Sequence, residues 1–175
     1  MHSFIELLEM STSFTLNAMH QTAETTLKAL ENSGSTALVK ATQMLSFQRV
    51  VMAVGMFSFF EAILQDRLDC KSGFEEARRI LDQHAQGDLK AQFADYHNAI
   101  NVLKHGRGRS YELLCHRATE LPFRIKGPEE QLFNEGDVSE ISTLIQVDDQ
   151  FIEGCAGTIV SVARAIQNAR PDVLL

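Results

Sequence analysis

Two histidines and an asparagine lie on one face of a predicted helix, at His97, Asn101 and His105. Residues four apart in a helix are neighbours on its surface, so the three side chains line up. Eight residues separate the histidines, a rise of about 12 Å, so both cannot ligate one metal ion unless the helix bends. The chain also has no paired Glu-x-x-His motif of the kind found in metal-binding bundles. We therefore expect no metal and no other cofactor.

A second candidate site follows directly, in a stretch that we call the basic turn (Lys104–Arg109). Lys104, His105, Arg107 and Arg109 fall within six residues, beside two glycines that let backbone amides approach a ligand closely. Such a turn between two helices suits a phosphate or a carboxylate. The structural alternative is that Lys104 and His105 only complement the dipole at the end of a helix.

The spacing of apolar residues predicts the elements that position this turn. Repeats of three to four residues indicate an all-α, up-and-down bundle of five to six helices in one domain over residues 1–175. Serine, glycine and aspartate separate the periodic stretches, and we expect Ser35, Asp88 and Asp148 or Asp149 to cap helices. The predicted helices cover residues 3–32, 35–69, 74–86, 88–104, 110–118 and about 149–170.

The long second helix is the most apolar element of the chain. Val50 to Phe60 contains no charge and is apolar on every face. A helix of this kind must be wrapped on all sides, so it is either the hub of the bundle or part of a dimer interface. The first helix carries a drifting apolar stripe at Ile5, Leu8, Phe14, Met19, Ala23, Leu27 and Leu30.

Residues 121–147 differ from the rest of the chain. Two of the three prolines lie here, with turn signals around Gly127 and Gly136. Two short β-prone runs, 121–125 and 143–147, either pair as a small ribbon or stay irregular. We interpret the segment as an excursion on the surface of the domain.

Composition restricts the compartment and the partners. The net charge of −7 opposes general binding to nucleic acid, so such binding requires a local basic patch. Cys70, Cys115 and Cys155 are widely spaced and odd in number, which favours free thiols in a reducing cytosol. The first residues do not resemble a signal peptide, and the longest uncharged apolar run has eleven residues. We expect a cytoplasmic protein that does not enter the membrane.

The stretch from Ile100 to His105 carries a family resemblance. With a long apolar helix before it in an all-α bundle, it resembles the Arg-Asn-x-x-x-His motif of the HEPN superfamily, over roughly residues 45–118. Many members are metal-independent ribonucleases in toxin–antitoxin, phage-defence or RNA-processing systems, usually with a site shared across a dimer. The resemblance implies that Asn101 is an orienting residue and that His105 is the acid/base at the scissile phosphate, a role that suits imidazole.

The chain departs from this motif at the arginine, whose position is held by Ile100. An arginine there would stabilise the charge of the phosphorane, and losing such a donor typically costs a few kcal/mol of transition-state stabilisation. Arg107 and Arg109 lie just past the histidine, in a different geometry. The substitution favours loss of cleavage over activity.

Two further residues have supporting interpretations. Glu61 is the only charge between Arg49 and Asp66, and it either hydrogen-bonds Asn101, His105 or an arginine of the turn, or occupies a narrow exposed strip. Tyr111 either stacks on a base or packs between helices.

Together with the resemblance, these features predict a HEPN-like helical domain that binds RNA or a protein partner such as an antitoxin, in a bacterial stress, toxin–antitoxin or defence context. We expect a homodimer, and endoribonuclease activity without a metal if the site is active. The alternative is a non-enzymatic helical module for protein–protein interaction or regulation, whose basic turn docks an acidic partner.

Overall fold

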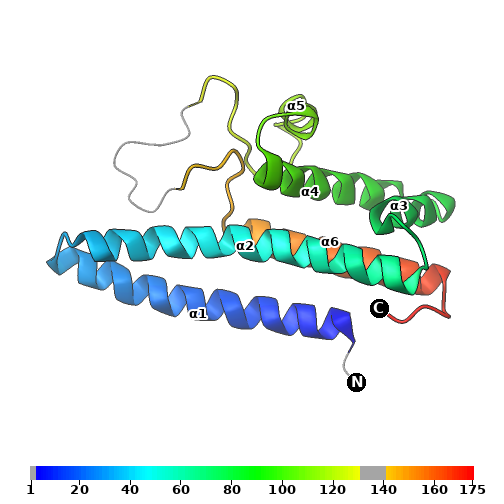
Figure 1. Cartoon of the computed structure of the whole chain (residues 1–175), viewed down its shortest axis with the longest axis horizontal. Coiled ribbons are helices and arrows are strands. Elements are labelled where there is room, and N and C mark those ends of the chain that lie inside the picture. The colour runs from blue at the N-terminus through cyan, green and yellow to red at the C-terminus, as the bar shows by residue number, and fades with distance from the viewer. Residues whose placement is uncertain (1–2, 131–140) are drawn as a thin grey trace.

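The computed structural model describes residues 3–130 and 141–175. This part of the chain folds into six helices, and Figure 1 shows the three longest running side by side with the shorter ones on one side of them. The helices are α1 (Phe4–Asn32), α2 (Thr36–Arg67), α3 (Gly73–Gln83), α4 (Gly87–His105), α5 (Arg109–Cys115) and α6 (Asp149–Ala169). The all-α bundle with a long apolar helix is confirmed.

The helix ends follow the local signals that the sequence contains. Ser35 caps α2 by accepting a hydrogen bond from the amide of Ala37, and Asp148 caps α6 by accepting one from Phe151 at 2.9 Å. Asp88 was expected to cap α4, and this was wrong. The chain leaves α3 through Ala85 in the left-handed region, α4 begins at Gly87, and Asp88 falls inside its first turn.

The core forms where α2 and α6 each pack against α1, α3 and α4 as well as against each other. An aromatic cluster joins α2, α3 and α4, with Phe74 and Phe93 ring centroids 5.2 Å apart and both rings beside Phe57 and Phe60. Edge-to-face pairs of this kind add ~1 kcal/mol each beyond the area they bury. The cluster fixes α4, and therefore the turn that follows it, on the bundle.

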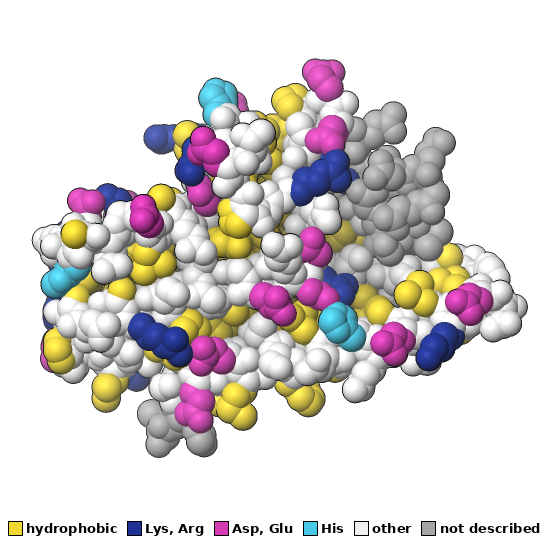
Figure 2. All heavy atoms as spheres, turned by 180° about the vertical axis from the view of Figure 1, so that it is seen from behind, with side chains coloured by type: hydrophobic (Ala, Val, Ile, Leu, Met, Phe, Trp, Pro, Cys, Tyr) yellow, Lys and Arg dark blue, Asp and Glu magenta, His cyan; other side chains and the backbone are white. Residues whose placement is uncertain are grey.

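The long helices α1, α2 and α6 also meet at one carboxylate. Asp149, in the first turn of α6, accepts a hydrogen bond from Arg49 Nε of α2 at 2.7 Å and contacts the His20 imidazole of α1. Burial raises the pKa of Asp149, but the hydrogen bonds from Arg49 and His20 outweigh burial and lower it. On the side of the molecule opposite to Figure 1, acidic and basic side chains are interspersed over the surface (Figure 2).

The residues that the structure describes do not wrap helix α2 on all sides. Only 28% of its most apolar 18-residue stretch is buried, and Met44, Phe47 and Phe59 are largely exposed. Among the described residues it is the one helix whose length and composition would allow it to cross a membrane, although the core helix of a soluble protein can have the same properties. Of the two interpretations of its apolar surface, complete wrapping by the described part of the bundle is wrong.

The apolar stripe of α1 was predicted only in part. Ile5, Leu8 and Met19 are buried as expected, whereas Phe14 and Leu27 are 75% and 55% exposed. The buried face is completed instead by Leu16 and by threonines, because apolar residues occur on both faces of this helix.

The segment after α5 is irregular, with one ribbon-like contact. Ile125 and Ile145 form an isolated antiparallel bridge, flanked by hydrogen bonds from Lys126 N to Leu144 O at 2.8 Å and from Gln146 N to Arg124 O at 3.0 Å. The two β-prone runs therefore meet at one point. The turn signal expected around Gly136 lies outside the described residues.

Candidate nucleic-acid interface

The basic turn is held by backbone geometry that only glycine adopts readily. Helix α4 ends at His105, and Gly106 follows with φ 73° while its amide donates to Val102 O at 2.8 Å. Gly108 is extended, and α5 begins at Arg109. Lys104 and His105 therefore lie in the last turn of α4, and Arg109 lies at the start of the next helix.

Side-chain contacts between α4 and α5 fix this turn further. Ser110 Oγ donates to Asn98 Oδ1 at 3.0 Å, and Arg117 Nη1 bonds Asp95 Oδ1 at 2.8 Å. Asp95 is buried, which raises its pKa, while Arg117 opposes that shift. These residues could not be predicted from the sequence, because partners 12 and 22 positions apart leave no local pattern.

The three positions that resemble the HEPN motif lie in three different environments. Ile100 is 2% exposed in the core. Asn101 is half-buried, and its Nδ2 lies 3.4 Å from His97 Nε2, one turn back along α4. His105 is exposed at the end of the helix. The structure therefore brings Asn101 together with His97 and not with His105.

His97 is held in its neutral form by its surroundings. Its ring packs edge-on against Phe74, with the centroids 4.7 Å apart. Burial, followed by the positive charges of Arg78 and Lys104, lowers the pKa of His97 to about 4. Because the Asn101 amide nitrogen can only donate, Nε2 of the neutral imidazole accepts the bond and Nδ1 carries the proton.

Arg107 points toward the segment after α5. Its Nη2 donates to Pro128 O at 3.2 Å, and its guanidinium carbon lies 5.7 Å from the centroid of the Tyr111 ring. Tyr111 is buried and donates its hydroxyl to Lys126 O at 2.9 Å, and burial raises its pKa. Tyr111 thus packs between elements, and Arg107 supports residues 126–128.

The other cations of the turn face solvent. Lys104, His105 and Arg109 are exposed and form no ion pair with the residues that the structure describes. Arginines elsewhere are commonly neutralised, as in the Arg49–Asp149 and Arg117–Asp95 pairs. Among the residues that the structure describes, the turn is therefore a local concentration of positive charge outside any ion pair, in an acidic chain.

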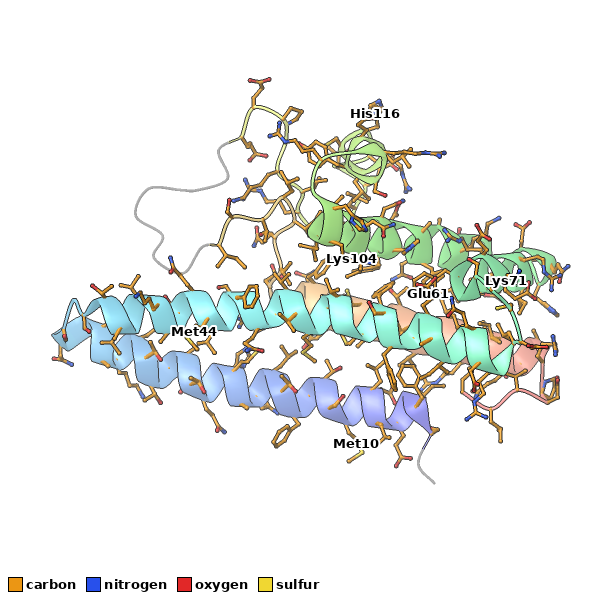
Figure 3. The ribbon with its side chains drawn as sticks, in the orientation of Figure 1. Met10, Met44, Glu61, Lys71, Lys104 and His116 are labelled. Carbon is orange, nitrogen blue, oxygen red and sulfur yellow. The ribbon has the colours of Figure 1, made fainter. Side chains whose placement is uncertain are left out.

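Glu61 is not part of this arrangement. Within residues 3–130 and 141–175 it makes no hydrogen bond to Asn101, His105 or an arginine, and its carbonyl lies under the start of α3, 2.7 Å from where a Cβ on Gly73 would be. Figure 3 labels Glu61 on α2, Lys104 at the far end of α4 and His116 at the end of α5. Over the same two ranges no group of three or more His, Cys, Asp or Glu side chains is arranged to hold a metal ion.

Comparison of the chain with protein-family models, with curated proteins and with solved structures finds no match.

Proposed function

We propose that this chain is a HEPN-like helical domain that binds RNA through the basic turn and does not cleave it. The observation that carries the proposal is the exposure of Lys104, His105 and Arg109 without ion-pair partners among the described residues. Cations that are already paired have little to offer a phosphate, whereas these can each replace a counterion on an RNA backbone. The turn also has a defined shape, which Gly106 and the Ser110–Asn98 bond support.

The environment of the motif residues supports binding over catalysis. General acid–base chemistry on a phosphate needs the imidazole, the orienting amide and a cation to converge on one point. Here the amide of Asn101 is engaged by His97, and the position of the family arginine is a core isoleucine. His105 would then contact a phosphate without moving its proton.

The cellular setting is part of the proposal. Cys70, Cys115 and Cys155 are all free thiols, which supports a reducing, cytoplasmic location. A bacterial stress, toxin–antitoxin or defence role follows from the family resemblance alone, as does an antitoxin-like protein partner.

A non-enzymatic interaction module is the second candidate, and one observation favours it. The outward face of α2 is apolar and uncovered, and exposed apolar patches of this kind commonly mark protein interfaces. This function does not require RNA.

The test is RNA retention in EDTA by the full chain, with Lys104→Glu/Arg109→Glu as the variant. Both side chains are exposed, so charge reversal leaves the packing intact, and we expect retention to fall and the salt dependence of binding to decrease by about two phosphate contacts. The control is Arg164→Glu/Arg170→Glu, which reverses two exposed arginines far from the basic turn in the sequence, one on α6 and one directly after it. Equal retention by both variants would exclude the basic turn as the site.

A further inference from the structure

The outward face of α2 forms one continuous strip. Between residues 44 and 62 the exposed side chains recur every three or four residues, which keeps them on one side of the helix. We call this set the α2 stripe: Met44, Phe47, Gln48, Val51, Gly55, Ser58, Phe59 and Ala62. Figure 3 shows Met44 on this helix, and 64% of its surface is exposed.

The α2 stripe is ordered by size. Its first half carries the large side chains Met44, Phe47, Gln48 and Val51, whereas Phe59 is the one large side chain of its second half, which otherwise carries Gly55, Ser58 and Ala62. When two copies of a helix run antiparallel, positions at equal distances on either side of the midpoint face each other. An antiparallel pair of these helices would therefore place Met44 and Val51 of one copy against small residues of the other, and Phe47 against Phe59.

The second half of the α2 stripe is also hollowed. A groove of about 600 Å³ opens there, and its lining includes Phe4, Phe59, Ala62 and Ile63. Phe59 is 62% exposed at the wall of this groove, and its ring meets Phe4 edge-on at 5.8 Å. The groove lies where an antiparallel partner would present its large residues.

Gly55 indicates a close approach from outside the chain. Glycine inside a helix destabilises it relative to alanine, so its presence calls for a reason. At Gly154 the reason is internal, because a Cβ would lie 1.9 Å from the Tyr96 hydroxyl. At Gly55 no atom of the described chain lies within 4 Å of such a Cβ. The room beside Gly55 serves nothing within its own chain.

Charges close the two ends of the stripe. Lys40 and Asp66 are exposed on the same side of α2, equally far from Ala53 at the midpoint of the α2 stripe. Lys40 forms no ion pair with a described residue, and Asp66 contacts only Arg67, at 3.6 Å. The two residues are roughly 39 Å apart along one helix, so they can meet only between copies.

We propose that a second copy of this chain covers the α2 stripe, in an antiparallel pair with its two-fold axis level with Ala53. A two-fold interface places the same patch on both subunits, so every large-to-small contact is made twice. About this axis Met44 and Val51 face Ala62 and Gly55 of the partner subunit, Phe47 faces the partner's Phe59, and Lys40 lies near the partner's Asp66. A lipid surface would require neither the small residues of the second half nor opposite charges at the two ends. The basic turn is not part of this interface, so the inference is independent of RNA binding.

The first test is the mass of the full chain by light scattering over a dilution series. We expect twice the mass of one 19.6 kDa chain, and the mass of one chain for Val51→Glu. Phe14→Glu is the matched control, because Phe14 is an exposed apolar residue on α1, away from the stripe. A wild-type mass of one chain overturns the proposal, and so does a monomer that co-sediments with phosphatidylcholine vesicles, which would assign the face to lipid.

The second test examines the geometry of the pair. Gly55→Leu adds bulk where its own chain has room, so we expect dissociation of a folded helical protein. Gly157→Leu, at an exposed helical glycine of α6 with equally open surroundings, should stay a dimer.

Charge reversal fixes the direction of the two helices. Lys40→Glu and Asp66→Lys should each raise the dissociation constant, and the double variant should restore it, which no contact within one chain can explain. A double variant as weak as the single ones would overturn the antiparallel arrangement.

Discussion

Asn101 donates a hydrogen bond to the imidazole of His97, one turn back along α4, and does not bond His105, one turn ahead. The three polar residues that were predicted to line up on one face are therefore divided. His97 and Asn101 form a half-buried pair, and His105 is exposed and separate from them. The pair stabilises α4, and the exposed histidine belongs to the basic turn. Their different environments give each a separate experimental signature.

The buried position of His97 predicts a pH dependence of stability. Its pKa is lowered to about 4 in the folded chain, so between pH 6.5 and 4 the unfolded chain binds more protons. The free energy of unfolding is therefore complete above pH 6.5 and falls by ~1–3 kcal/mol as the pH drops toward 4. Urea unfolding of the wild type and of His97→Gln, which keeps an acceptor for Asn101, measures this contribution. His105→Gln should retain the wild-type slope, and an unchanged slope in His97→Gln would contradict the assignment.

Because the backbone at Gly106 is left-handed, we expect any side chain at this position to lower the free energy of unfolding. Gly106→Ala should lower the free energy of unfolding by ~1–2 kcal/mol, because a Cβ disfavours φ 73°. Gly108→Ala is the control two residues away, since Gly108 is extended and a Cβ there meets no atom within 4 Å. Thermal unfolding of the two variants separates the effects. Equal losses would mean that the backbone at Gly106 is not the source.

We expect that an arginine at the position of the family arginine would destabilise the folded protein and would not produce RNA cleavage. Ile100→Arg would place a charge in a core position that is 2% exposed, at a cost of ~3–5 kcal/mol. Unfolding by urea together with RNA incubation in EDTA measures both properties. A stable variant that cleaves RNA would show that a small shift of α4 completes the site, contrary to the proposed binding function.

The helix boundaries could be predicted because they depend on neighbouring residues. Glycine and serine near positions 33–35, 71–73 and 106–108 interrupt the periodic stretches, and a helix ends or begins beside each of them. Helices α3 and α5 nevertheless end at Gln83 and Cys115, three residues before the predicted bounds. The exposed face of α2 could not be predicted in the same way. A helix that is apolar all round has no periodic difference between its inner and outer faces.

The position of the candidate site along the chain could be predicted from the sequence, but its side-chain contacts could not. The cations of the basic turn follow from composition, and all four are exposed, as an anion site requires. The burial of His97 depends on Phe74, which comes from another helix, and the orientation of Arg107 depends on Pro128. These contacts arise from tertiary packing, which local spacing does not record.

Asp149 has a consequence for how the three long helices can move. Apolar packing between helices resists separation but opposes sliding along the axis only weakly. A hydrogen bond joins two particular atoms, so it breaks when one of them moves along the axis. The contacts of Asp149 with Arg49 and His20 join α1, α2 and α6 at one level of the bundle. A slip of either neighbour by one turn, about 5.4 Å, would break its contact with this carboxylate. Asp149 therefore sets the axial register of the three long helices, and with it the position of the exposed face of α2 along the bundle.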